Sequence, residues 1–224
     1  MKAVEIKKGV WWVGAIDRDL RNFHGYSTEK GSTYNAYLII DDKITLVDTV
    51  KSDFYPEMMT RVRSVIDPKK IDYVVSNHSE MDHSGAISKF IKDVPGVEII
   101  VSPNGHKTLQ QYFKEDYQYK VVQNGETLSI GERTLHFYLT PMVHWPDSMV
   151  TYIPENKLLL SNDAFGQHLA SEVRFDDQTQ KDILFHQAAK YYANIVLPYG
   201  RQVVKALELL GGVDIDMIAP SHGI

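Results

Sequence analysis

The sequence predicts an α/β protein, of the α+β kind, in which two mixed sheets pack face to face and helices lie outside. Short apolar segments bounded by turn residues recur along the chain, as strands require. Amphipathic segments with apolar residues three or four apart follow these strands in both halves. Strands followed by helices, twice over, indicate two layers of sheet with helices on their outer faces.

The chain opens with short strands. Glycine and aspartate turns, at Lys8-Gly9 and Asp41-Asp42, interrupt apolar segments of strand length. Trp11 and Trp12 are expected on opposite faces of one of these strands, because side chains alternate along a strand. The expected strand segments are residues 3–16, as two strands, 33–40 and 43–48.

Helices and strands then alternate up to residue 113. Residues 52–66 carry apolar side chains four apart, so we expect an amphipathic helix that Ser52 caps and that ends before Pro68. The segments that follow are a strand at 71–75, a helix at 84–94, a strand at 97–102 and a helix at 104–113.

From Tyr119 onward the chain returns to strands, which implies a second sheet. A helix from about Gln178, another at 201–210 and a last strand at 216–220 complete the chain. There is no repeat, low-complexity tract or linker, so residues 1–224 are expected to form one domain. The five strands expected in the second sheet are 119–123, 126–130, 134–139, 148–153 and 157–161.

Composition excludes several classes of protein. With 43% hydrophobic residues, a net charge of −5 and a pI near 6.0, the chain reads as globular and unsuited to bind nucleic acid or an anionic membrane. It has no cysteine, so any metal must be held by histidine, aspartate and glutamate. The start of the chain has no apolar core of signal-peptide length, and no apolar run could cross a membrane, so a cytoplasmic protein is expected.

The segment IDYVVSNHSEMDHSG, residues 71–85, carries the strongest functional signal. An apolar strand stops abruptly, and His78, Glu80, Asp82 and His83 follow within six residues. Ligands at the C-terminal end of a strand lie where α/β sheets usually place their chemistry. If the segment is extended, positions 78, 80 and 82 point the same way. A metal site is therefore predicted, the alternative being a polar loop that caps the strand.

Three more candidate ligands follow apolar strands later in the chain. His144 lies in a loop beside Trp145 and Pro146, and Asp163 and His222 each follow a strand. A single histidine or aspartate at a strand end is more often a satisfied polar group. All three recur at strand ends together with the first cluster, which makes a shared metal centre the better interpretation.

The spacing H-x-E-x-D-H resembles the metal motif of the metallo-β-lactamase superfamily, whose hydrolases usually have histidine where this chain has Glu80. That exchange adds a hard oxygen donor, which favours redox-active iron over zinc. Together with FHGYST, TYNAYLI, HWPDSM, SNDAFGQH, YYANI and PSHG, it resembles the diiron domain of flavodiiron proteins, also called A-type flavoproteins, over nearly the whole chain.

The resemblance implies roles for individual residues. His78, Glu80 and His144 would hold one iron, Asp82, His83 and His222 the other, and Asp163 would bridge them. His24 and Tyr192 would lie nearby and donate a proton or a hydrogen bond to a reacting oxygen. His168 is a further candidate near the metals, whereas His106, His136 and His186 are expected to be structural or exposed.

The resemblance also implies reduction of dioxygen to water or of nitric oxide to nitrous oxide. Electrons would come from FMN on a flavodoxin-like domain, across a head-to-tail homodimer, fed by rubredoxin or a similar donor. This chain ends two residues after His222 and lacks a flavodoxin-type phosphate loop. We therefore expect residues 1–224 to be the diiron domain of a longer protein, truncated after the last ligand, with poor sustained turnover alone.

Two rival functions stay open. A dinuclear zinc hydrolase of the same fold would use metal-activated water on an ester, thioester or amide, although Glu80 speaks against it. A metal-binding or degenerate scaffold would serve only dimerisation and partner docking. The kind and number of metal ions in the native protein would separate these functions from the reductase.

Overall fold

Two large sheets face each other at the centre of the protein, whose computed structural model describes residues 1–224. The first sheet has the order β1 (Val4–Lys7), β2 (Val10–Trp12), β7 (Tyr37–Ile39), β8 (Ile44–Val47), β9 (Ile71–Ser76), β10 (Glu98–Val101) and β11 (Tyr119–Val121). The second has the order β12 (Thr127–Ser129), β13 (Thr134–Leu139), β14 (Met149–Ile153), β15 (Leu158–Asn162) and β16 (Met217–Pro220). The predicted pair of mixed sheets is confirmed.

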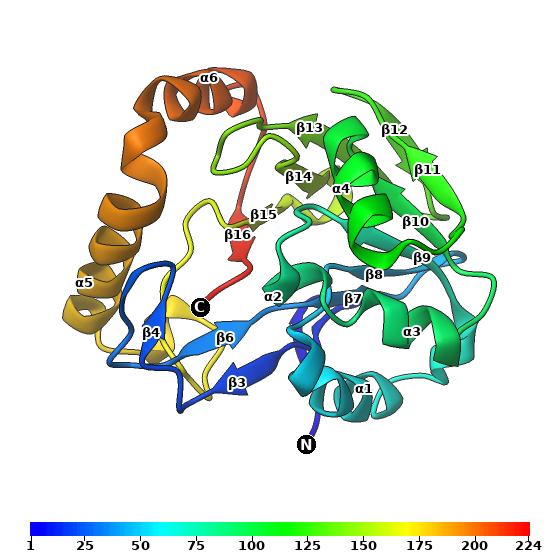
Figure 1. Cartoon of the computed structure of the whole chain (residues 1–224), viewed down its shortest axis with the longest axis horizontal. Coiled ribbons are helices and arrows are strands. Elements are labelled where there is room, and N and C mark those ends of the chain that lie inside the picture. The colour runs from blue at the N-terminus through cyan, green and yellow to red at the C-terminus, as the bar shows by residue number, and fades with distance from the viewer.

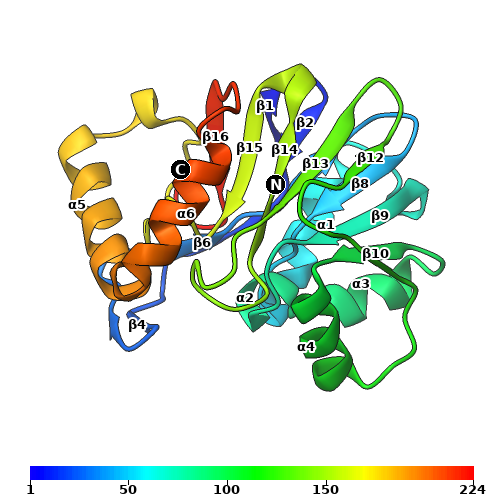
Figure 2. The ribbon, with the colours of Figure 1, turned by 90° about the horizontal axis from the view of Figure 1, so that it is seen from above.

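Helices lie outside both sheets, as predicted. Figures 1 and 2 show α1 (Tyr55–Arg63), α3 (Ile87–Asp93) and α4 (Pro103–Phe113) beyond the first sheet, and α5 (Lys181–Tyr191) and α6 (Gly200–Leu210) beyond the second. The short helix α2 (Met81–Ser84) points into the middle of the molecule. No helix has the length and apolarity needed to span a bilayer.

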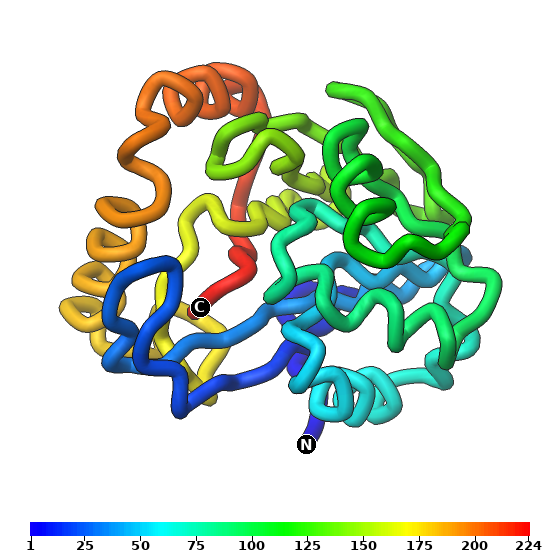
Figure 3. Tube along the Cα trace, viewed as in Figure 1, coloured from blue at the N-terminus to red at the C-terminus, as the bar shows by residue number.

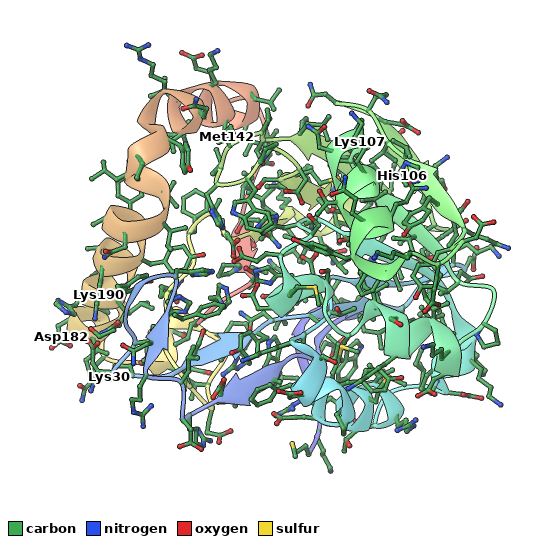
Figure 4. The ribbon with its side chains drawn as sticks, viewed as in Figure 1. Lys30, His106, Lys107, Met142, Asp182 and Lys190 are labelled. Atoms are coloured by element: carbon green, nitrogen blue, oxygen red, sulfur yellow. The ribbon has the colours of Figure 1, made fainter.

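Two small hairpin-like sheets border the same central region. β3 (Ala15–Asp17) pairs with β6 (Ser32–Tyr34), and β4 (Asn22–Phe23) pairs with β5 (Tyr26–Ser27). The tube in Figure 3 shows this early part of the chain running beside α5 and close to the C-terminus. Lys190 of α5, labelled in Figure 4, forms an ion pair with Glu29, two residues after β5.

The alternation of side chains along the strands divides the core into layers. In β9, Val75 packs with Phe137 and Leu160 between the sheets, whereas Val74 packs with Met58 against the helices. This follows from the two-residue period of a strand with both faces buried. Because both faces of β9 are fixed by packing, the residues just beyond it emerge at a defined place and angle.

Several predicted boundaries were wrong for local reasons. Residues 33–40 form two strands, because the chain turns at Asn35, whose side chain accepts from the Trp12 indole and donates to the Pro220 carbonyl. The helix predicted from Ser52 begins as a 3₁₀ turn, Ser52–Phe54, becomes α-helical at Tyr55 and ends at Arg63, and Ser52 makes no capping hydrogen bond.

The second sheet also begins later than predicted. β11, which contains Tyr119, pairs in parallel with β10 and so closes the first sheet. Parallel pairing after a helix is the ordinary βαβ connection, and the alternating pattern alone does not say which sheet a strand joins. The second sheet therefore starts at β12, with Thr127.

Candidate metal centre

The predicted ligands lie where strands of both sheets end. His78 and Glu80 follow β9, Asp163 directly follows β15, and His222 is two residues beyond β16, which is parallel to β15. The backbone amide of Met149 donates to the Asn77 carbonyl at 2.9 Å and so joins the two sheets at this end. The C-terminal ends of the strands therefore converge on one region of the molecule.

The structure brings the seven predicted ligands together in two adjoining groups. Each group offers atoms within 4.8 Å of one another, a spacing compatible with one ion. The first group is His78, Glu80, His144 and Asp163, and the second is Asp82, His83 and His222. This division follows the one that the resemblance implied, with Asp163 at the boundary.

The Asp163 carboxylate faces both groups with different oxygens. Its Oδ2 lies 3.1 Å from His144 Nε2 and 3.5 Å from His78 Nε2. Its Oδ1 lies 3.1 Å from His83 Nε2 and 3.5 Å from His222 Nε2. A carboxylate so placed can ligate one ion with each oxygen.

The atoms of the second group face one another without hydrogen bonding. Both oxygens of Asp82, Nε2 of His83 and Nε2 of His222 are buried without a hydrogen bond, and Asp82 Oδ2 lies 3.1 Å from His222 Nε2 and 3.3 Å from His83 Nε2. A buried carboxylate costs several kcal/mol unless positive charge lies beside it. A cation is the partner that such converging donor atoms lack, so this donor set fits a metal ion.

Hydrogen bonds from outside orient two of the imidazoles. His78 Nδ1 donates to Asp147 Oδ2 at 3.0 Å, and His222 Nδ1 donates to the Thr33 carbonyl at 2.6 Å. A carbonyl oxygen only accepts, so the proton of a neutral His222 is on Nδ1, and Nε2 is left with a lone pair facing Asp82 and Asp163. This is the usual support of a metal-binding histidine.

Mutual attraction of charges shapes the titration of the cluster. Burial disfavours charge on His83 and His144, yet the carboxylates beside them raise the pKa of each to about 9. Burial likewise opposes charge on Asp163, but the neighbouring histidines hold its pKa well below the usual value. Without metal, protons therefore take the positions that cations would otherwise occupy.

His24 lies at the first group, as predicted. Its Nε2 is 3.1 Å from Glu80 Oε1, and its Nδ1 is buried without a partner. The residue has a φ of 50°, in the left-handed region, beside Gly25 at the turn between β4 and β5. The hairpin thus holds one imidazole over the carboxylate that distinguishes this motif.

The prediction for Tyr192 picked the wrong tyrosine. Tyr192 is 42% exposed, whereas Tyr191 is 2% exposed and its ring centroid is 5.9 Å from that of His222. Neighbouring helical residues point about 100° apart, so only one of the pair can face the centre. Burial, and then the charges of Asp163 and Asp82, raise the pKa of the Tyr191 hydroxyl well above its usual value.

His168 also lies beside the second group, whereas the other histidines do not. Its Nδ1 bonds the Ser32 hydroxyl at 2.8 Å, and burial, followed by the charges of His222 and His24, lowers its pKa to about 2. It is therefore neutral. His106 lies on α4, away from the centre (Figure 4), and neither His136 nor His186 belongs to either group of ligands.

Two buried acids beside the centre were missed. Asp147 accepts from His78, from the Ser79 amide at 2.7 Å and from the Ser79 hydroxyl at 2.6 Å. Asp48 is 4% exposed and accepts from the Asn77 amide at 2.8 Å. Asp48 directly follows β8, in KITLVD, which is the same signal that identified Asp163, whereas Asp147, in HWPDSM, lies two residues before β14.

Comparison with known proteins agrees with this geometry. The model of the ODP family, described as an ODP family beta lactamase, matches residues 33–223. The chain is 46% identical to a nitric oxide reductase of Moorella thermoacetica and 47% identical to a rubredoxin-oxygen oxidoreductase of Megalodesulfovibrio gigas. These alignments cover 99% and 100% of this chain, but the chain spans only 57% of each relative's length.

Solved structures show the same fold. The rubredoxin oxygen:oxidoreductase of Desulfovibrio gigas superposes with a TM-score of 0.97 at 47% identity, over 100% of this chain and 57% of that one. The flavodiiron protein of Giardia intestinalis does so with a TM-score of 0.97 at 38% identity, over 100% and 55%. The resemblance to flavodiiron proteins is confirmed, and the chain belongs to the ODP family of beta-lactamase-like proteins.

Proposed function

We propose that this chain holds two iron ions and is the domain of an oxidoreductase that reduces dioxygen to water, nitric oxide to nitrous oxide, or both. The single observation that carries the proposal is Asp163, which directs one carboxylate oxygen to each of two groups of histidine and carboxylate donors. Such an arrangement suits a pair of ions that act together.

The seven ligands are proposed in the roles that the motifs implied. His78, Glu80 and His144 would hold one ion, and Asp82, His83 and His222 the other, with Asp163 shared. Two ferrous ions there would supply two electrons to a substrate by becoming ferric. Two ferrous ions carry four positive charges, and the three carboxylate ligands carry three negative charges. One positive charge remains, which one further anion would cancel in this buried site.

Other residues of the chain orient and protect this centre. Asp147 and the Thr33 carbonyl hold the imidazoles of His78 and His222 in one tautomer. His24, whose Nε2 lies beside Glu80 and whose Nδ1 has no partner, is proposed to donate a proton or a hydrogen bond to the substrate. Tyr191 takes the position proposed for Tyr192 and presents a buried hydroxyl on the side of the second group.

The source of electrons is proposed from the relatives. Their names mention rubredoxin and flavorubredoxin, and they are longer than this chain. We propose that the domain works within a longer protein that carries FMN on a flavodoxin-like domain, receives electrons from rubredoxin or a similar donor, and forms a head-to-tail homodimer. A cytoplasmic location is proposed with it.

The rival functions have less support. The relatives named above are named for reduction of nitric oxide or oxygen, and none for hydrolysis. Glu80 replaces an imidazole of the zinc motif with a carboxylate whose Oε2 lies 3.3 Å from Nε2 of both His78 and His144. A scaffold without metal would not need the unpaired donor atoms of the second group.

Metal analysis and gas reduction test the proposal together. Protein purified without oxygen from iron-replete cells should contain about two irons, and the chemically reduced form should consume dioxygen or nitric oxide in a single turnover. The matched control is Glu80→His, which restores the zinc motif and should raise the zinc-to-iron ratio. Protein that holds zinc natively, or di-iron protein that reacts with neither gas, contradicts the proposal.

A further inference from the structure

An apolar cavity of about 370 Å³, open to solvent at Phe165 and Leu207, which are 51% and 53% exposed, lies between the second sheet and the helices α5 and α6. Thirteen of its sixteen lining residues are hydrophobic, and none carries a charge. Ten of them are valines, alanines or leucines, and seven of these ten come from β14, β15, α5 and α6. In Figure 2 these helices lie on one side of the second sheet.

The cavity shares a wall with the metal centre. Val143 and Ala164 line it, and each adjoins a proposed ligand, His144 or Asp163. Tyr191 also lines it, and the centroid of its ring lies 5.9 Å from that of His222. The Tyr191 ring is therefore the main barrier between the cavity and the second group of proposed ligands.

The Tyr191 ring is fixed in this dividing position. Gly166 packs directly against it, since a Cβ on Gly166 would lie 3.1 Å from Cζ of the ring. Val143, Ile195 and Val196 belong to the same buried apolar cluster as the ring. The hydroxyl is buried without a hydrogen bond of ordinary geometry, and burial, together with the nearby Asp163 carboxylate, raises its pKa.

We propose that this cavity takes up small apolar gas molecules and passes them along Tyr191 to the metal centre. The inference rests on the proposed function, because only a centre that consumes dioxygen or nitric oxide needs such a supply. Both gases are small, uncharged and more soluble in apolar surroundings than in water. The cavity would raise their local concentration beside the ligands.

The lining favours a gas over water or an ion. A buried water needs two to four polar partners, and one of the few hydroxyls here, that of Ser161, already donates to the Ala164 carbonyl at 2.6 Å. Without a charged residue in the wall, an ion has no counter-charge. Enclosed apolar cavities of about 150 Å³ take up xenon or benzene, and the apolar wall of this open cavity offers the same kind of contact.

Xenon is a suitable probe, because it occupies the same kind of space and does not depend on metal chemistry. Crystals of the metal-loaded protein under xenon pressure should show xenon in this cavity. Ala206→Phe on α6 places a ring in the space and should remove the xenon site, as should Ala188→Leu on the opposite wall. The control is Val204→Phe, on the same helix but 53% exposed and not in the wall.

The same variants test delivery of the gas. In stopped-flow oxidation of the reduced diiron protein, the second-order rate constant with dioxygen should fall about tenfold in Ala206→Phe and Ala188→Leu, and should be unchanged in Val204→Phe. Unaltered thermal unfolding and iron content would show that the variants fold and keep their ligands. An equal loss in the control variant would contradict the proposal.

The outcomes separate this inference from the proposed function. Absence of xenon, xenon with unchanged oxidation rates in the filled variants, or a bound lipid-like molecule in its place overturns the delivery role, even if the wild-type protein consumes gas. A wild-type diiron protein that reacts with neither gas overturns the proposed function instead, and the inference falls with it.

Discussion

Substitution of Asp147 tests how the first group of proposed ligands is held in place. Its Oδ2 accepts three hydrogen bonds, from His78 Nδ1 at 3.0 Å, the Ser79 amide at 2.7 Å and the Ser79 hydroxyl at 2.6 Å. Burial alone would raise the pKa of this carboxyl, but its bonds with His78 and Ser79 keep it below its usual value. Asp147 is therefore ionised and makes the His78 imidazole a better ligand.

Asp147→Asn keeps the size of the side chain and removes its charge. Loss of such a carboxylate partner typically weakens metal binding by 10- to 100-fold, which corresponds to about 1.4–2.8 kcal/mol. Iron or cobalt affinity, measured by competition with a chelator, should fall by that amount for the first ion. The exposed Asp182, on α5, provides the control, and Asp182→Asn should leave affinity unchanged.

One result would refute a role of Asp147 in metal binding. If Asp147→Asn lowers the free energy of unfolding of the metal-free protein but leaves both metal affinities intact, Asp147 only stabilises the loop. Hydrogen bonds to a charged group contribute about 1.5–3 kcal/mol each, so a purely structural loss would be easy to detect. Affinity and stability must therefore be measured on the same variant.

Three further predictions concern the bridge, the tyrosine pair and the histidines. Asp163→Asn should lower the metal content from about two ions to one or fewer, as counted by plasma emission spectroscopy, because both groups lose a charged oxygen. Tyr191→Phe should raise the free energy of unfolding of the metal-free protein by about 1 kcal/mol in urea titrations, since it removes an unpaired buried hydroxyl, whereas Tyr192→Phe should not change it. The pKa values of His83 and His144, about 9, exceed the value near 6.5 that histidine has in an unfolded chain. The metal-free protein should therefore lose stability as pH rises from about 6.5 to 9, and its iron affinity should rise over the same interval. A stability of the metal-free protein that does not change between these pH values would contradict this.

The periodicity of apolar residues predicted the layers of the fold but not which sheet each strand joins. Val74 and Val75 alternate between two cores, as the apolar run from Ile71 required. Tyr119 was assigned to the wrong sheet, because pairing is decided by contacts distant in sequence and not by the strand's own residues. The break at Asn35 depends on hydrogen bonds with Trp12 and Pro220, which no local pattern encodes.

Ligand candidates could be found because each stands out against an apolar strand. His78, Asp163 and His222 all follow apolar strands, and the C-terminal end of a strand is where α/β sheets usually place functional polar residues. Asp147 gave a weaker signal, since it precedes β14 in the loop that also contains His144. The choice between Tyr191 and Tyr192 required the rotation of α5, which a sequence with two adjacent tyrosines does not define.

The helical turn α2 explains why one short motif can serve two ions. Had residues 78–82 been extended, His78, Glu80 and Asp82 would have pointed to one centre, as the alternation of a strand requires. Met81–Ser84 is helical instead, so Asp82 and His83 rotate away from His78 and face His222. Gly85 permits this tight turn, since a Cβ there would lie 2.2 Å from the Met81 carbonyl oxygen. The strand positions the first group, the helical turn positions the second, and Asp163, which comes from the other sheet, faces both.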